Sequence, residues 1–377
     1  MTEIRREIRP LVGIRGPATA FVVLFHLNTV MSRLFPRTSS WYNYLASATV
    51  AVDFFFMLSG FVIAHTYLES MRTFSRESTR HYLTLRVARI FPVHIVMVIA
   101  FVVYDKVAKE LIGFGLSAHN VDPLNVLMNV TMLQEIPPGT AINPPSWSLA
   151  PEFGAYLLFP FLAVLLWRIR DPRAAFAGAA VVLIAGALLL SQMYDGFGPN
   201  GGGYAVAWVR IAICFTSGCL LNIGWRQLGP RARQGRFWDL IAVVSVVVVG
   251  VIIWLMARHG EFTVPVATLP FLGLLVVACA GAAGRFATLL GSRVVERSGR
   301  VSYSVYLTHF LVIIIAYYFI VTRHMEAYSD SMRLLVFLVT VLAIVIVGVA
   351  TYFLVEEPSR KLIRRLERRR VVTHSGR

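Results

Sequence analysis

The chain has 377 residues, of which 57% are hydrophobic and 15% are charged, and its formal net charge is +16 at pH 7. Apolar runs of about twenty residues recur along the sequence, and a helix needs a run of that length to cross a bilayer. This composition excludes a soluble protein. The arginines near the ends of the apolar runs are explained by membrane orientation rather than by nucleic-acid binding. We therefore expect an all-α polytopic integral membrane protein.

Ten segments are long and apolar enough to form transmembrane helices, and an even number places both termini on one side of the membrane. Basic residues are concentrated on that side, for example Arg76 and Arg80 after the second segment and RKLIRRLERRR near the C-terminus. Short loops rich in arginine and lysine stay in the cytoplasm, so both termini are predicted to be cytoplasmic. The ten segments are 11–33, 45–68, 90–112, 146–167, 174–192, 204–224, 237–257, 265–286, 301–322 and 333–356.

Two connections between these segments have features of their own. Residues 69–89 are polar and predict a helix on the cytoplasmic face. Residues 121–147 combine a short amphipathic stretch with a proline-rich loop, which predicts a re-entrant or interfacial element on the outer face. We expect one transmembrane domain over 1–357 and a basic cytoplasmic tail over 358–377. The absence of an internal repeat weakens the interpretation as an inverted-repeat transporter.

The N-terminus and the cysteines predict no further chemistry. The sequence MTEIRREIRP is polar and has no small-residue cleavage site, so we expect no removable signal peptide. Cys214, Cys219 and Cys279 lie in apolar segments without metal-ligand spacing. We expect these cysteines to pack in the interior, and we expect neither a metal site nor a disulfide framework.

Ionisable residues interrupt several of the apolar segments. A charged side chain at the bilayer centre costs on the order of 2.5–3.5 kcal/mol, so such residues usually face a partner or a water-filled cavity. Arg15 and His26 are eleven residues apart, which in a helix is a rise of about 16 Å and a return to within about 20° of the same direction. We expect them to line one helix face at two depths. The candidates are Arg15, His26, Asp53, Glu152, Arg210 and His309.

The direction of each predicted helix divides these residues by depth. His26, Asp53 and Glu152 are predicted to lie at similar depth in the outer half, on three different helices. Arg210 is expected at a comparable level. Arginines gather instead near the cytoplasmic ends of the helices. That cytoplasmic group is Arg15, Arg86, Arg89 and Arg300.

The two groups fit the chemical demands of acyl transfer. A hydroxyl acceptor needs a general base, for which histidine is suited, and a neighbouring carboxylate can orient the imidazole. A donor with several phosphates needs arginines, whose guanidinium binds phosphate at two points. Each group also has a purely structural interpretation. A histidine and a carboxylate can form a packing pair, Arg15 can extend to the interface, and Arg86 and Arg89 can act only as orientation signals.

Five stretches of the sequence together resemble a known family. They are IRGPATAFVVLFH with its R-x10-H pair, VDFFFMLSGFVIA, RVARIFP, PPSWSLAPEF and GRVSYSVYLTHF. Each stretch is weak by itself, but in this order and at this spacing the set resembles the membrane-bound acyltransferase family 3 over almost the whole chain. The likeness is greatest to the stand-alone members, which have no fused SGNH-type domain and O-acylate sugars, glycolipids, antibiotics or polysaccharide precursors.

The resemblance implies roles for the residues that match the family's motifs. His26 would be the catalytic histidine with Arg15 as its partner along the helix, and Arg86 and Arg89, in the R-x-x-R motif, would help to bind acyl-CoA from the cytoplasm. No metal is implied. The resemblance also implies a multi-pass protein of the bacterial cytoplasmic membrane.

Two further motifs supply weaker candidates. Ser148 and Glu152 fit the S-x-x-x-E pattern, but Pro151 departs from the family's sequence and predicts a kink directly before the glutamate. Trp147 precedes this motif and is suited either to stacking on a sugar ring or to an interfacial aromatic belt. The candidates for substrate binding are Trp147, Ser148, Arg210, Tyr303, Tyr306 and His309.

The resulting hypothesis is a membrane O-acyltransferase that moves an acyl group, most often acetyl, from acyl-CoA to a hydroxyl of a carbohydrate-containing acceptor. His26 is expected to be the general base, with Glu152 or Asp53 assisting it. The alternatives are a transporter or flippase of a glycolipid or small polar solute, and a scaffold whose polar residues pair helices. The identity of the acceptor, the acyl length, direct transfer or an acyl-enzyme, and a homo-oligomeric state are left open.

Overall fold

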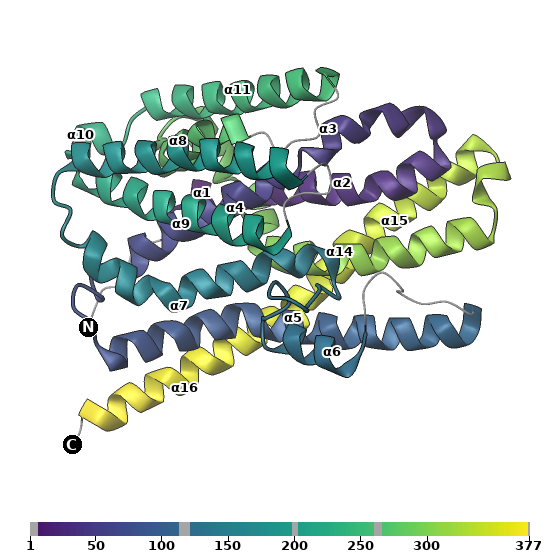
Figure 1. Ribbon diagram of the computed structural model, residues 1–377, viewed down its shortest axis with the longest axis horizontal. Helices are drawn as coiled ribbons and strands as arrows, with labels where there is room; N and C mark the ends of the chain where they lie inside the picture. Colours follow the sequence, from purple (N-terminus) through teal and green to yellow (C-terminus); the bar gives the residue numbers. More distant parts are fainter. Residues whose placement is uncertain (1–6, 113–120, 198–202, 260–265, 376–377) are drawn as a thin grey trace. The chain divides into compact units, whose positions relative to one another are not determined.

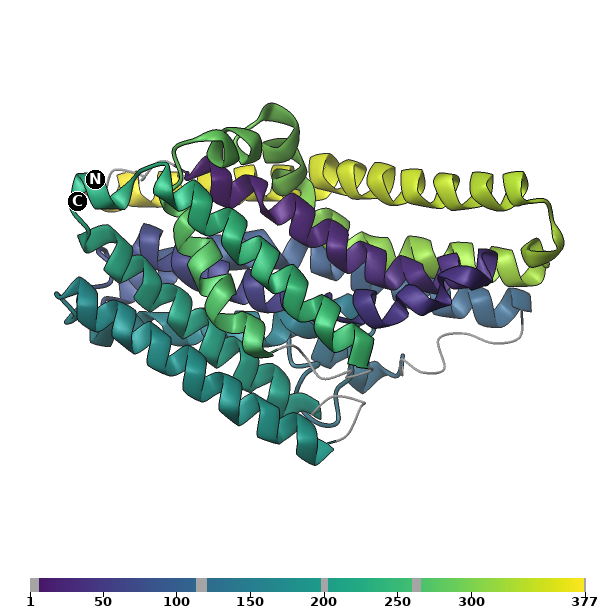
Figure 2. The same cartoon turned by 90° about the horizontal axis from the view of Figure 1, so that it is seen from above.

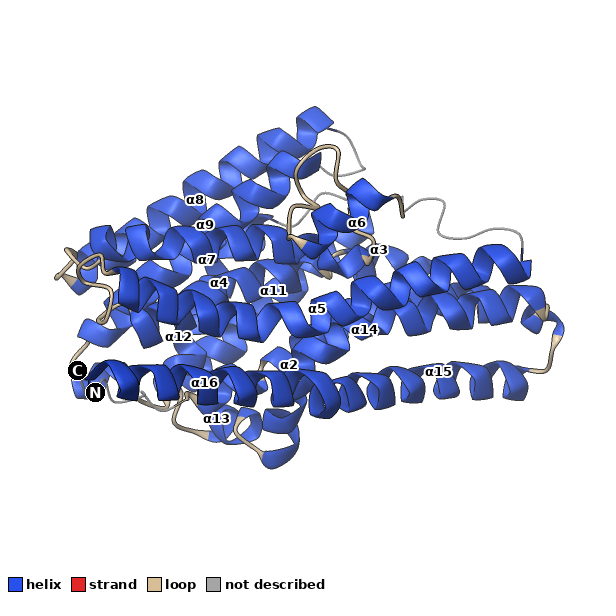
Figure 3. Ribbon diagram, turned by 90° about the horizontal axis from the view of Figure 1, so that it is seen from below, coloured by secondary structure: helices blue, strands red, loops and turns tan. Residues whose placement is uncertain are grey.

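The computed structural model describes residues 7–112, 121–197, 203–259 and 266–375. All regular elements in this part of the chain are helices, as Figure 3 shows by its uniform helix colour. Figure 1 and Figure 3 together give their labels. The helices are α1 (Arg9–Gly13), α2 (Arg15–Leu34), α3 (Tyr42–Ala46), α4 (Thr49–Tyr67), α5 (Arg76–Ile112), α6 (Pro123–Val130), α7 (Leu149–Leu166), α8 (Pro172–Phe197), α9 (Gly203–Gln227), α10 (Pro230–Arg233), α11 (Phe237–His259), α12 (Leu269–Gly281), α13 (Arg285–Leu290), α14 (Arg293–Thr322), α15 (Asp330–Thr351) and α16 (Glu357–Ser375).

The helices confirm the prediction of an all-α polytopic membrane protein. Within the described residues, 9 helical segments are long and apolar enough to cross a bilayer, and they correspond to nine of the ten predicted segments. The exception is 265–286, where the apolar helix covers only Val266–Gly281 and is shorter than a full span. A break before Arg285 ends this helix, because residues 282–284 leave the helical conformation before α13 begins.

The helix predicted in the polar connection over 69–89 is confirmed from Arg76 onward, but it is not separate from the third span. Helix α5 runs without interruption from Arg76 to Ile112 and includes Pro92 in its interior. The polar helix and the apolar span are therefore one element. The hydropathy pattern located the apolar half of α5 correctly but placed its beginning too late, because the polar half is equally helical.

The chain forms two compact units. Unit 1 consists of Met1–Asn28, Arg37–Phe74 and Leu158–Ser302. Unit 2 consists of Thr29–Pro36, Ser75–Leu157 and Tyr303–Arg377. Helices α2, α7 and α14 contribute residues to both units.

Unit 1 is built around the contact between α4 and α9, with α8 packed on α9 and α12 packed on α4. Glycines allow α4 and α9 to approach closely. A Cβ atom on Gly60 would lie 2.0 Å from the Phe215 carbonyl oxygen, and one on Gly218 would lie 2.0 Å from the Met57 carbonyl oxygen. Small residues at such contacts are typical of helix pairs in membranes, where close backbone packing replaces the hydrophobic effect.

Unit 2 contains the longest helical path among the described residues. Helix α15, a π-helical turn over Tyr352–Glu356 and helix α16 follow one another without a loop, and Figure 2 and Figure 3 show them in line. Helix α16 packs against α5. The basic tail expected over 358–377 is therefore helical up to Ser375, and residues 376–377 lie outside the described part.

The predicted outer element of unit 2 has the expected local structure. Helix α6 is 8 residues long, too short to cross a bilayer, and the Asp122 side chain caps it by accepting a hydrogen bond from the Asn125 N–H at 2.9 Å. A loop follows and ends in a 3₁₀ turn over Pro144–Ser148 that leads into α7. Its position at the outer membrane surface remains a prediction.

Candidate functional site

Arg15 and His26 lie on a single helix of unit 1. Helix α2 begins at Arg15 and is unbroken to Leu34, so the eleven-residue spacing places both residues toward one helix face, as predicted. The start of α2 is tightly packed, because a Cβ atom on Gly16 would lie 2.0 Å from the Ser298 Oγ atom. The His26 ring lies beside Phe25, with ring centroids 4.8 Å apart. The backbone therefore holds Arg15 in a fixed place at one end of α2 and His26 farther along.

Asp53 and Arg210 form a buried ion pair between α4 and α9 of unit 1. Arg210 Nε lies 2.8 Å from Asp53 Oδ1, and Arg210 Nη2 donates to the Thr49 carbonyl oxygen at 2.9 Å. The Arg210 side chain is only 5% exposed and the Asp53 side chain only 2%. Cys214 Sγ lies 3.9 Å from the same Asp53 oxygen. The sequence named both charged residues as candidates but gave no sign that they pair.

Glu152 has a defined orientation on α7 in unit 2. The Tyr156 hydroxyl, one helical turn later, donates a hydrogen bond to Glu152 Oε1 at 2.5 Å. Pro151 was expected to be able to kink the helix directly before the glutamate, and its place in α7 bears on that expectation. Because α7 begins at Leu149, Pro151 lies in the first helical turn, where a backbone N–H would have no partner within the helix.

Arg86 lies close to the same tyrosine. Its guanidinium carbon is 5.9 Å from the ring centroid of Tyr156 and 5.9 Å from that of Tyr82, within the range of cation–π attraction. Glu152 and Arg86 are therefore separated by one tyrosine side chain. The prediction that Glu152 belongs to an outer group, distant from the arginines of α5, does not hold within unit 2.

Two tyrosines of the GRVSYSVYLTHF stretch, which lies on α14, connect this region to the loop before α7. The Tyr303 hydroxyl donates to the Ile90 carbonyl oxygen on α5 at 2.7 Å. Tyr306 lies one turn later, and its hydroxyl donates to the Pro145 carbonyl oxygen at 3.0 Å and lies 3.0 Å from Ser148 Oγ. The structure therefore brings Ser148 and Tyr306 together, two residues that the sequence named separately.

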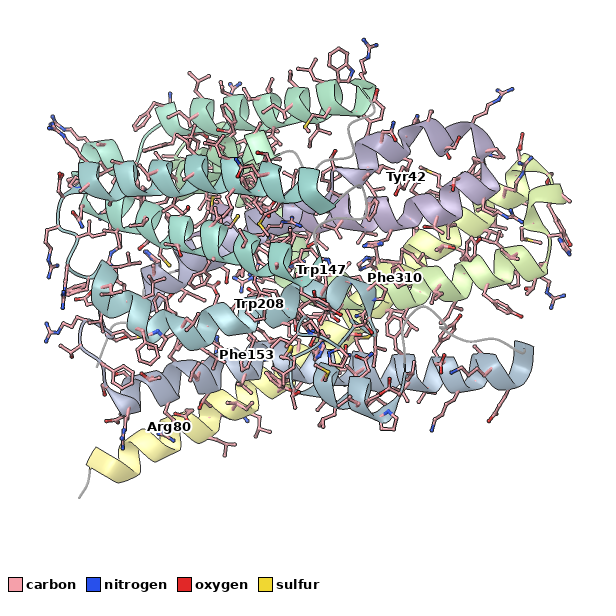
Figure 4. All side chains as sticks on the ribbon, viewed as in Figure 1. Tyr42, Arg80, Trp147, Phe153, Trp208 and Phe310 are labelled. Carbon is pink, nitrogen blue, oxygen red and sulfur yellow. The ribbon has the colours of Figure 1, made fainter. Side chains whose placement is uncertain are left out.

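The remaining weak candidates lie near this part of unit 2. His309 is fully buried, its Nδ1 atom lies 3.2 Å from the Val305 carbonyl oxygen, and its ring centroid is 6.1 Å from that of Tyr306. Trp147 is half-buried on the 3₁₀ turn, and Figure 4 labels it together with Phe310 of α14. Its role in sugar binding remains a prediction.

Sequence reasoning missed a buried carboxylate in unit 2. Glu356 is 1% exposed, and Ser304 Oγ donates to its Oε2 atom at 2.7 Å. Arg360 Nη1 lies 3.4 Å from its Oε1 atom. The adjacent glutamates and the proline in VEEPSR, at the end of the last apolar segment, were a signal that one of the two acids is held inside.

A second missed acid lies in the loop between α6 and α7. Glu135 is half-buried, and burial raises the pKa of its carboxyl from 4.5 to about 7. Among the residues that the structure describes, no group of three or more histidine, cysteine, aspartate or glutamate side chains is arranged to hold a metal ion.

An all-helical membrane protein that buries a histidine, carboxylates and arginines within its spans has the residue types of a membrane enzyme or transporter. Comparison with known families identifies the class further. The chain belongs to the acyltransferase domain family, whose model matches residues 11–353. This confirms the resemblance found in the sequence and makes the protein an acyl-transferring enzyme by family.

Individual relatives agree with this assignment. The chain is 28% identical over 281 residues to the acyltransferase MdmB of Streptomyces mycarofaciens, a match that covers 70% of this chain and 68% of MdmB. It is 23% identical over 338 residues to the putative peptidoglycan O-acetyltransferase YrhL of Bacillus subtilis, covering 84% of this chain and 50% of YrhL. It is 20% identical over 376 residues to the O-acetyltransferase OatA of Staphylococcus aureus, covering 94% of this chain and 58% of OatA.

The chain thus spans only about half of YrhL and of OatA and about two thirds of MdmB. No solved structure matches it.

Proposed function

We propose that the protein is a membrane O-acyltransferase that transfers an acyl group, most often acetyl, from acyl-CoA to a hydroxyl of a carbohydrate-containing acceptor. Two relatives are described as O-acetyltransferases, and one of these as acting on peptidoglycan, whose glycan strands carry hydroxyl groups. The bacterial origin of the relatives and the long apolar helices support a place in the bacterial cytoplasmic membrane.

The observation that carries the proposal is the arrangement of arginines on α5. Arg86 lies within cation–π range of the Tyr82 and Tyr156 rings, one turn of α5 before the Tyr303 hydrogen bond to Ile90. Tyrosine side chains therefore lie along the stretch of α5 that carries Arg86 and Arg89. A cationic site of this kind, at the predicted cytoplasmic end of α5, suits the phosphate groups of a CoA thioester.

The proposed reaction needs one base and balances without a metal. His26 would accept the proton from the acceptor hydroxyl while the oxygen attacks the thioester carbonyl carbon. The carbon–sulfur bond then breaks, the CoA thiolate leaves, and the proton that His26 accepted returns through solvent to the thiolate. Arg15, Arg86 and Arg89 would bind donor phosphates. Asp53 and Glu152 remain the candidates for assisting His26, and Asp53 is already paired with Arg210.

The test compares two histidine variants. Membranes containing wild-type protein, His26→Asn or His324→Asn at equal expression are incubated with labelled acetyl-CoA and glycan or lipid-linked sugar acceptors. His324 is exposed and has a positive φ of 49°, a conformation that asparagine tolerates, so it is a matched control. We expect at least a hundredfold loss of labelled product for His26→Asn and none for His324→Asn.

Unchanged product formation in His26→Asn would contradict the catalytic role. Movement of the sugar across the membrane without any CoA release would favour a transporter instead.

A further inference from the structure

Helices α5 and α16 form an antiparallel pair in unit 2. Near the beginning of α5, Arg80 Nη1 lies 3.8 Å and His81 Nδ1 lies 3.3 Å from the carboxylate of Glu367 on α16. The Arg80 label of Figure 4 marks this end of the pair. Farther along α5 the partner is the beginning of α16, and Figure 1 shows the two helices running side by side. The α5 residues that follow Arg80 by two or three turns therefore face the start of α16.

Hydrogen bonds place Glu356 at that end of the pair. Tyr303 donates to the carbonyl oxygen of Ile90, the residue after Arg89. Ser304, the next residue of α14, donates to Glu356 Oε2 at 2.7 Å. Neighbouring residues of α14 therefore bond to α5 beside Arg89 and to Glu356, which brings Glu356 to the turn of α5 that carries Arg89.

The π turn explains why Glu356 faces inward. Thr340, Ile344 and Gly348 form the buried stripe of α15. In an uninterrupted α-helix, Val355 would point in nearly the same direction as Gly348. The seven residue steps from Gly348 to Val355 turn the helix by about 700°, which is close to two full turns. The π turn over 352–356 inserts one extra residue, so Glu356 takes that direction. Arg360 then follows Glu356 by four residues, on the same side of the helix.

Glu356 orients Arg360 toward α5. Arg360 Nη1 lies 3.4 Å from Glu356 Oε1, and the Arg360 side chain is only 22% exposed. Arg360 lies within electrostatic range of Arg89 and Arg364. A single carboxylate therefore holds an arginine beside two others of the same charge.

Like charges come close together in this region. Arg360 lies within electrostatic range of two further arginines, Arg89 and Arg364, and its ion-pair partner is Glu356. Partly buried arginines that repel one another lower the stability of the helix pair unless an anion joins them. A guanidinium group binds phosphate in two-point geometry, so phosphate is the anion that this arrangement suits.

We propose that Arg360 extends the donor site onto α16 by binding a phosphate group, with Glu356 as the positioning residue that orients it. The proposal rests on the proposed function, because acyl-CoA is the phosphate-bearing molecule of that reaction. Phospholipid headgroups carry the same chemical group, so the experiment must separate the two sources of phosphate.

The test measures the binding of CoA to the full chain in nanodiscs of zwitterionic phosphatidylcholine by calorimetry. Arg360→Gln is compared with Lys361→Gln, which removes the same charge from the next residue of α16. Lys361 is 62% exposed and pairs with Glu357 at 2.9 Å, away from Arg360. We expect the Kd of CoA to rise about tenfold in Arg360→Gln and less than twofold in Lys361→Gln.

Glu356→Gln tests the positioning role. It keeps an acceptor for Ser304 but removes the charge that attracts Arg360, so we expect the Kd of CoA to rise about threefold. The KM for the sugar acceptor should not change, whereas a general loss of structure would alter both constants. A change in the acceptor KM of the same size as the change in Kd would overturn the positioning role.

The outcomes separate the two proposals. If wild-type protein does not bind CoA, the proposed function fails and the Arg360 proposal fails with it. If wild-type protein binds CoA and Arg360→Gln binds it equally well, only the Arg360 proposal fails. In that second case, the phosphatidylglycerol that stays bound to the protein through purification is compared between wild type and Arg360→Gln. Less bound phosphatidylglycerol in Arg360→Gln would identify a lipid headgroup as the bound phosphate and would likewise overturn the donor role.

Discussion

Unit 1 and unit 2 both bury arginines and carboxylates within membrane-spanning helices, but the two units balance these charges differently. In unit 1, Arg210 and Asp53 match one to one, and the Thr49 carbonyl oxygen accepts from a second nitrogen of the arginine. In unit 2, Arg360 pairs with Glu356 and also lies within electrostatic range of Arg89 and Arg364. A matched pair satisfies itself and fixes two helices, whereas neighbouring arginines favour the binding of an anion.

Breaking the matched pair of unit 1 is expected to have the largest effect on stability. Asp53→Ala leaves the Arg210 charge buried without its carboxylate and should lower the free energy of unfolding by about 3–5 kcal/mol. Thermal unfolding of the purified protein measures this loss as a lower Tm. The double variant Asp53→Ala/Arg210→Ala should lose less than the sum of the two single losses, because neither charge is left alone. Additive losses would contradict the pairing.

Removing a charge from unit 2 should change donor binding and leave folding nearly unchanged. Arg86→Gln is expected to raise the Kd of CoA about tenfold, since it removes a charge-assisted contact to phosphate, while Tm stays within a few degrees of wild type. Calorimetry with CoA and thermal unfolding of the same sample provide both values. Arg72→Gln is the control, because Arg72 is an exposed arginine on the same predicted side of the membrane. An equal rise in Kd for Arg72→Gln would indicate general attraction rather than a site.

Polar contacts without charge should have a smaller effect. Tyr306→Phe removes the hydroxyl that donates to Pro145 and lies beside Ser148, at a cost of about 1 kcal/mol in the free energy of unfolding. Tyr317→Phe on the same helix is the control, because its side chain is exposed. Thermal unfolding distinguishes the two variants. An equal Tm for both would mean that the Tyr306 hydroxyl does not hold the loop to α14.

Most of the fold follows from hydropathy, because the bilayer fixes the length of an apolar helix. The pattern also correctly placed Arg15 and His26 on one helix, since that relation depends only on residues in sequence. It misjudged α12 and the beginning of α5, because the end of a helix depends on local backbone conformation as well as on polarity. Within the site, spacing identified Ser148 and Tyr306 as candidates but not as neighbours.

The pairing of charges was beyond sequence reasoning for a physical reason. Asp53 meets Arg210 because Gly60 and Gly218 let α4 and α9 approach closely, which is a property of the packed helices. Glu356 faces the protein because of one π turn, and a strict period of 3.6 residues would have pointed Val355 inward instead. Single-residue shifts of this kind have little effect on hydropathy but decide which side chain is buried.

The smallest expected effect concerns Glu135, an acid of unit 2 whose environment is set by burial. Burial raises the pKa of its carboxyl from 4.5 to about 7 in the folded protein. Below about pH 7 the folded state takes up a proton that the unfolded state does not bind until about pH 4.5. The free energy of unfolding therefore increases as the pH falls from about 7 to 4.5. It decreases again as the pH rises from 4.5 to about 7.

Thermal unfolding at pH 5 and pH 8 tests this pH dependence. Glutamine does not ionise, so Glu135→Gln should have a smaller difference in Tm between the two pH values than wild type. Its Tm at pH 8 should be higher than that of wild type, and its Tm at pH 5 should be close to that of wild type. Glu77→Gln, at an exposed glutamate of the same unit, should leave both values unchanged. The effect should be a few degrees at most, because Glu135 keeps part of its surface in contact with solvent. If Glu135→Gln and wild type show the same pH dependence, the carboxyl of Glu135 ionises in the folded protein as it does in the unfolded chain.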